Sequence, residues 1–149
     1  MKTLRDRLVS VALEWERVYG IAPQITSAIA EYDAARLVKC SEKEYCTQMQ
    51  GRTAVSKGHD FIFEGKRYQV KANRPSGKPG SFVTLVGKAA NFNWDFLVWV
   101  LYDRMFQLQE AWLWDVKAYR QRFEFQKRLS PNDMRAGKAL HALRRNHAV

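Results

Sequence analysis

Apolar residues recur every three or four positions at the start of the chain, which predicts an amphipathic helix over residues 2–19. Gly20 and Pro23 mark its end. This spacing is typical of one buried face, and we expect that face to contain Leu4, Leu8, Val11, Ala12, Trp15 and either Val18 or Tyr19. A second helix is expected from Thr26 or Ser27, either of which could cap it, to about Lys39.

The middle of the chain changes to alternating and continuous apolar runs, which are typical of strands. A tight turn at 64–66 predicts a hairpin, and two prolines and two glycines mark a loop over 74–81. The run 94–102 is almost wholly apolar, which predicts a central strand covered on both faces. In chain order, we expect strands at 60–64, 67–73, 82–86, 94–102 and 106–114.

The C-terminal part begins with a segment, 119–125, that fits a short helix or an irregular edge. Ser130, Pro131 and Asp133 then form a strong helix start, and we expect this last helix to continue to about Arg145. It would carry a basic side formed by Arg135, Lys138, Arg144 and Arg145. The whole pattern predicts a single α+β (α/β) domain over residues 1–149, with a mixed sheet of four to five strands flanked by helices.

Composition supports a folded protein, because 46% of the residues are hydrophobic and 13% are aromatic. The two cysteines, Cys40 and Cys46, form no framework of pairs, so we expect buried, reduced thiols and a cytoplasmic location. The three histidines show no zinc-ligand spacing. No apolar stretch reaches the roughly 18 residues of a membrane span, so no membrane partner is expected.

Charge points to a polyanionic partner. The net charge is +10, and the excess grows along the chain: Lys and Arg outnumber Asp and Glu by 9 to 8 in residues 1–60, 7 to 4 in residues 61–110 and 9 to 3 in residues 111–149. A basic surface of this size attracts nucleic acid. The alternative is a soluble protein that is merely basic.

The hairpin carries the candidate chemistry. Gln69 and Lys71 alternate with apolar residues and therefore share one face of their strand, and pairing in the hairpin brings that face beside Asp60. A carboxylate, an amide oxygen and the backbone carbonyl of Val70 are the oxygen ligands that Mg²⁺ prefers. The ammonium of Lys71 could stabilise an attacking hydroxide or the reacting phosphorus.

This arrangement of Asp60 and Gln69-Val70-Lys71 resembles the restriction-endonuclease-like, or PD-(D/E)xK, nuclease superfamily over about residues 28–115. The resemblance implies a Mg²⁺- or Mn²⁺-dependent endonuclease that hydrolyses phosphodiester bonds in DNA, with Glu31 as a helical metal ligand. The sequence departs from the pattern in two places: Gln69 replaces the second acid, and His59 replaces the proline before the first acid. The alternative is a weak or inactive nucleic-acid-binding module of the same fold.

Several polar residues near the hairpin are candidates for contacting nucleic acid: Arg67, Asn73, Arg74, Lys78 and Lys88. The segment that follows the hairpin could lie against a phosphodiester backbone or could be a plain polar connection. In the same way, Asp60, the Gln69–Lys71 face and Glu31 could simply be a strand start, a solvated strand edge and a solvated helix face. One site per chain would require a homodimer to cut both strands of DNA in one encounter, and a domain that binds an acidic protein partner is a third hypothesis.

Overall fold

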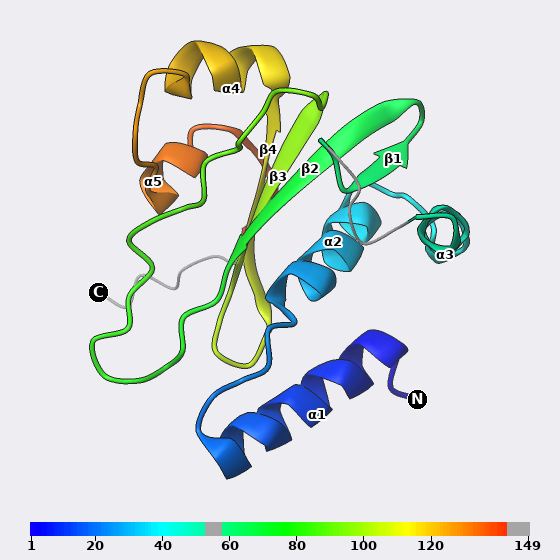
Figure 1. Ribbon diagram of the computed structural model, residues 1–149, viewed down its shortest axis with the longest axis vertical. Coiled ribbons are helices and arrows are strands. Elements are labelled where there is room, and N and C mark those ends of the chain that lie inside the picture. Colours follow the sequence, from blue (N-terminus) through cyan, green and yellow to red (C-terminus); the bar gives the residue numbers. More distant parts are fainter. Residues whose placement is uncertain (53–57, 143–149) are drawn as a thin grey trace.

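The computed structural model describes residues 1–52 and 58–142, and its centre is one mixed sheet in the order β1-β2-β3-β4-β5 (Figure 1). Neighbouring strands are antiparallel except β2 and β3, which run parallel. The mixed five-stranded sheet confirms the predicted fold class. The strands are β1 Phe61–Phe63, β2 Lys66–Asn73, β3 Phe96–Tyr102, β4 Leu108–Asp115 and β5 Lys138–Ala142.

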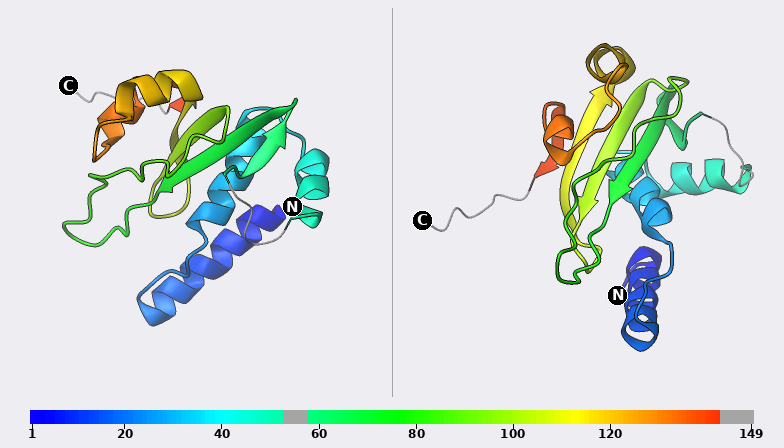
Figure 2. Two further views of the ribbon diagram at one scale, coloured as in Figure 1. Left: turned by 45° about the horizontal axis from the view of Figure 1, so that its top comes forward. Right: turned by 60° about the vertical axis from the view of Figure 1, so that its left-hand side comes forward.

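Helices lie on both sides of this sheet (Figure 2). One side is covered by α2, with α3 beside β1 and α1 lying outside α2, and the other side carries α4 and α5. The helices are α1 Leu4–Tyr19, α2 Thr26–Leu37, α3 Glu42–Gln50, α4 Val116–Phe123 and α5 Pro131–Met134. No helix among the described residues is long and apolar enough to cross a membrane.

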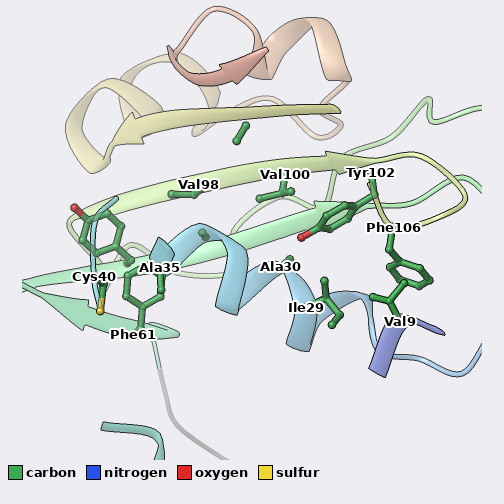
Figure 3. Packing of buried hydrophobic residues seen from close by; sticks show 13 residues of the cluster. Val9, Ile29, Ala30, Ala35, Cys40, Phe61, Val98, Val100, Tyr102 and Phe106 are labelled. Carbon is green, nitrogen blue, oxygen red and sulfur yellow. The ribbon is translucent and has the colours of Figure 1, made fainter. Parts of the chain in front are cut away.

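The two faces of β3 are buried in two separate clusters. On one face, Val98 and Val100 pack beneath α2, whose alanines allow a close approach of the helix to the sheet (Figure 3). On the other face, Leu97 and Trp99 join Trp114 and the aromatic residues of α4. Residues 97 to 100 are all 0% exposed, which confirms the prediction of a central strand covered on both sides.

The β1–β2 hairpin forms where it was predicted. Glu64 and Gly65 have φ values of 50° and 74°, so both central residues of the turn are left-handed. This conformation fits the right-handed twist of the two strands, and glycine adopts it without steric strain. The turn therefore sets the register that places Phe61 opposite Tyr68.

Three of the sequence predictions for helices and strands are wrong in detail. The predicted buried face of α1 is largely exposed, and only Val9 and Ala12 of this helix are buried. The helix α2 begins at Thr26, as predicted, but its N-cap residue is Ile25, and neither Thr26 nor Ser27 provides a side-chain cap. Residues 82–86 form no strand; a single bridge from Val86 to Leu129 replaces it.

The prediction of a long C-terminal helix is also wrong. Ser130 does cap a helix, with the predicted capping box, but α5 ends at Met134 and the chain then forms β5. The strand β5 pairs with the edge of β4, whose backbone groups would otherwise lack partners. The side chain of Arg135 forms an ion pair with Glu110 at 2.7 Å. Residues 143–149, with the remaining two arginines of the predicted basic side, lie outside the described residues.

The two cysteines differ from each other: Cys40 is buried, as predicted, whereas Cys46 is exposed on α3. Cys46 is exposed because α3 lies at the edge of the sheet, and no residue of this helix is buried. The start of α3 agrees with the sequence, because Ser41 and Glu44 form a capping box there.

Candidate functional site

The candidate site lies at the start of β1, where β2 continues beyond its shorter neighbour. Asp60 directly precedes β1, and its backbone N–H donates to the carbonyl of Tyr68 at 2.7 Å. Its carboxylate Oδ2 accepts a hydrogen bond from the N–H of Val70 at 2.7 Å. Because β1 extends no further than this point, the Asp60 carboxylate takes the place of the missing strand neighbour of Val70.

Glu31 meets Asp60 from the helix side. It lies in the middle of α2, on the face of the helix that covers β2, and it is partly buried. Its carboxyl lies close enough to that of Asp60 for each group to affect the pKa of the other. The structure therefore brings together the two carboxylates that were predicted to hold a metal, from positions far apart in the sequence.

Burial raises the pKa of both carboxyl groups. It raises the pKa of Glu31 to about 7, with the negative charge of Asp60 as the next cause and the positive charge of Arg52 opposing both. Burial also raises the pKa of Asp60, against the opposing effects of the Val70 N–H and the charges of Arg52 and Lys71. Without a bound cation, Glu31 therefore keeps its proton up to about neutral pH.

Gln69 and Lys71 lie on the other face of β2. They share one face of the strand, as predicted, and that face is opposite to the one covered by α2. The charge of Lys71 is nevertheless close enough to lower the pKa of Asp60, which lies at the strand edge between the two faces. The carbonyl of Val70 points toward the same edge as its N–H, and hence toward Asp60.

The donor set fits a hard divalent cation better than a soft one. It would contain two carboxylates, one backbone carbonyl and one amide oxygen, which suit Mg²⁺ or Mn²⁺. Among the described residues, no three His, Cys, Asp or Glu side chains are grouped so as to hold a metal ion. Such a site would therefore depend on Asp60 and Glu31 for its charge, with neutral oxygens and water completing the shell.

Two residues near the acid pair, Arg52 and Tyr45, were not predicted from the sequence as parts of a site. Arg52 donates to the backbone carbonyls of Asp60 and His59, the latter at 2.7 Å, and its charge counteracts those of the acids. Tyr45 of α3 has its pKa raised to about 12 by burial and by the charges of Glu31 and Asp60. A loop arginine and a helical tyrosine carry no local signal of this role, since it arises only from the packing of α3 against β1.

The candidate nucleic-acid residues have different surroundings. Arg67 is exposed and pairs with Asp95 at 3.2 Å, while Lys78 is exposed and lines a groove of about 690 Å³ together with Arg17 and Arg104. The other three candidates, Asn73, Arg74 and Lys88, make contacts within the fold.

Asn73, Arg74 and Lys88 each use their polar groups within the fold. The side chain of Asn73 accepts from the indole of Trp99 at 2.9 Å. The guanidinium of Arg74 pairs with Glu16 at 3.1 Å, and the ammonium of Lys88 donates to two carbonyls after α4, each at 2.8 Å. These three side chains therefore stabilise the fold, whereas Arg67 and Lys78 remain accessible to a partner.

Comparisons with known proteins add no family to this description. The scan against protein-family models found no match, and the search of curated proteins found no match either.

Proposed function

We propose that this protein is a divalent-cation-dependent hydrolase of phosphodiester bonds in nucleic acid, with DNA as the expected substrate. The observation that carries this proposal is the partly buried pair of Glu31 and Asp60 at the open edge of β2, next to the charge of Lys71. A partly buried acid pair in which Glu31 keeps its proton up to about neutral pH is well placed to exchange that proton for a cation.

Each residue of the site has a distinct part in this proposal. Asp60 and Glu31 would hold Mg²⁺ or Mn²⁺, with the Val70 carbonyl and the Gln69 amide oxygen as neutral ligands. The bound cation would supply Lewis acidity and lower the pKa of a ligated water. Lys71 would stabilise negative charge that develops on the attacking oxygen or on the phosphoryl group. The net charge of +10 would attract the polyanionic substrate.

A second candidate function is binding of nucleic acid without cleavage. The observation that favours it is Gln69, which is neutral and lies on the face of β2 opposite to α2 and therefore to Glu31. A neutral amide on that face holds a cation less firmly than a third carboxylate beside the acid pair would.

Cleavage of supercoiled plasmid and of an end-labelled DNA duplex in the presence of Mg²⁺ or Mn²⁺ tests the proposal. We expect Asp60→Asn and Lys71→Met to lower the rate by at least about 100-fold, since each removes a charge from the reacting centre. Matched controls are available on the same hairpin: Glu64→Gln and Lys66→Met remove exposed charges and should leave the rate within about twofold.

The outcomes separate the candidate functions. Cleavage that persists unchanged in both site variants would contradict a catalytic role for this site. Salt-dependent DNA binding with no cation-dependent cleavage would favour the second candidate. If neither cations nor DNA shift the melting temperature, a domain that binds an acidic protein partner becomes the better explanation.

A further inference from the structure

The helix α1 carries a line of exposed apolar side chains that nothing in the described structure covers. We call this line the α1 stripe; it consists of Leu4, Leu8, Val11, Trp15 and Val18. Their exposed fractions are 71%, 41%, 61%, 52% and 57% in that order. Single exposed apolar residues are ordinary on a protein surface, but a contiguous line of large ones marks an interaction site.

The stripe is not the side by which α1 attaches to the domain. The helix lies outside α2, and the side chain of Val9 meets the core near Ile29 and Phe106 (Figure 3). Arg5 adds an ion pair to Asp33 at 2.8 Å. At 100° per residue, Val9 lies roughly a third of a turn away from the middle of the stripe, so the stripe points away from the core, although Leu4 and Leu8 at its N-terminal end border a pocket against α2.

The spacing within the stripe is that of a coiled-coil seam. Successive members are separated by four, three, four and three residues, which is the alternation of a and d positions in a heptad. Leu8 and Trp15 take the a positions, and Leu4, Val11 and Val18 take the d positions. An isolated amphipathic surface helix usually has a broader apolar face, so this narrow seam indicates a helical partner.

Charges beside the seam select the partner and its direction. Arg7 and Glu14 occupy the two successive g positions; both are exposed, and neither forms an ion pair with another described residue. In an antiparallel pair of identical helices, the g positions of the two copies face each other. Arg7 of each copy then meets Glu14 of the other, which gives two reciprocal ion pairs from one sequence.

The register that pairs these charges also pairs the apolar residues of the two stripes. With Arg7 opposite Glu14 of the second copy, Leu8 packs against Val11 of the second copy and Leu4 against Trp15 of the second copy. A parallel pair would place the g positions beside Ala12 and Tyr19 at the e positions, where no opposite charge is available. The antiparallel arrangement alone satisfies both the apolar and the charged positions.

We propose that α1 forms a twofold-symmetric, antiparallel contact with α1 of a second copy of this chain. The contact is short, since a helix of 16 residues is about 24 Å long. Its area therefore falls at the small end of specific interfaces, and a dissociation constant in the micromolar range is expected. The resulting homodimer would hold two copies of the Asp60 site, but the proposal does not depend on that site being catalytic.

Sedimentation equilibrium of the full chain between about 5 and 500 µM tests this contact. We expect a reversible monomer–dimer equilibrium in the wild type. Val11→Asp should weaken association at least about 30-fold by placing two like charges in the centre of the seam. Ser10→Asp, which adds the same charge to α1 outside the stripe, is the matched control and should leave association within about twofold.

Charge reversal tests the direction of the helices. Arg7→Glu and Glu14→Arg should each weaken association by about fivefold or more, because each creates two like-charge contacts. The double variant should restore it, since the reciprocal pairs return with the charges exchanged. All these sites are exposed, so far-UV circular dichroism should show an unchanged fold.

Several results would overturn the proposal. One is a monomer over the whole concentration range. Another is association that Val11→Asp does not affect, or a double reversal that remains as weak as the single ones. Cosedimentation of the wild type with vesicles of phosphatidylcholine and phosphatidylglycerol, lost in Val11→Asp and without self-association, would assign the stripe to a lipid surface instead.

Discussion

Replacing Glu31 by glutamine should stabilise the cation-free protein at pH 8 and leave its stability near pH 4 almost unchanged. The pKa of Glu31 is raised from an ordinary value of 4.5 to about 7, chiefly by burial and then by the charge of Asp60. Below pH 4.5 the carboxyl is protonated in both the folded and the unfolded chain, so its ionisation has no effect on folding. Above pH 7 it is ionised in both, and the folded protein bears the full penalty of a partly buried charge.

The size of the effect follows from that difference. A rise from 4.5 to about 7 corresponds to an upper limit of about 3.4 kcal/mol, at 1.36 kcal/mol per pH unit. Glu31 is only partly buried, so solvent screening reduces the expected effect to about 1–2 kcal/mol. Stability of the wild type relative to Glu31→Gln is thus lost as the pH rises from 4.5 through 7.

Urea unfolding of both proteins at pH 4, 5, 6, 7 and 8, without divalent cations, measures this difference. The glutamine keeps the shape of the side chain and can still donate a hydrogen bond to Asp60, so few other contacts change. Glu64→Gln, on the exposed hairpin turn, serves as the control and should show no such pH dependence. A Glu31→Gln variant that is equally destabilised at every pH would refute the reasoning, because it would mean that Glu31 is stabilising while ionised.

Three further substitutions test the packing that supports the site, each by the free energy of unfolding in urea. Gly137→Ala should cost more than about 2 kcal/mol, because a Cβ there would lie 2.8 Å from the carbonyl oxygen of Leu113; a loss below 0.5 kcal/mol would show that this backbone can move. Trp99→Phe should cost about 2–3 kcal/mol, since it opens a gap under β3 and leaves the amide oxygen of Asn73 without its indole donor; an unchanged stability would speak against that bond. Arg74→Met should lower the free energy of unfolding by about 2–4 kcal/mol, because it leaves the carboxylate of Glu16 on α1 unpaired. A much smaller loss at low pH than at high pH would identify that carboxylate as the cause.

Local signals explain which parts of the fold were predictable. The hairpin and β3 were found because a glycine turn and an unbroken apolar run determine their structure within a few residues. The prediction of a long C-terminal helix was wrong for a related reason. Ser130 and Asp133 do start a helix, but its length is decided by the open edge of β4, which lies far from them in the sequence and takes residues 138–142 as a strand.

The apolar face of α1 shows a second limit. Spacing of three and four residues establishes that a helix is amphipathic, but it does not say which molecule covers the apolar side. In this chain the domain takes up Val9 and Ala12, while Leu8 and Trp15 remain exposed. The spacing therefore predicted an apolar face correctly, but not which part of that face the domain itself would cover.

The site was predictable in part. Alternation placed Gln69 and Lys71 on one face of β2, and the hairpin placed Asp60 beside them. Glu31 was named only through the family resemblance, since nothing local distinguishes it from Asp33, two residues further on. The structure separates the two: Asp33 accepts hydrogen bonds from Arg5 and from the hydroxyl of Tyr102, whereas Glu31 reaches Asp60.

The central claim is that the Glu31–Asp60 pair exchanges the proton of Glu31 for a divalent cation. Calorimetric titration of Mn²⁺ into the protein at pH 6.5, in two buffers of different ionisation enthalpy, tests it directly. We predict binding with release of up to about one proton per ion, and loss of that release in Glu31→Gln, because the raised pKa of Glu31 keeps it mostly protonated at this pH. Absence of binding heat, or binding whose proton release is the same in wild type and Glu31→Gln, would contradict the claim.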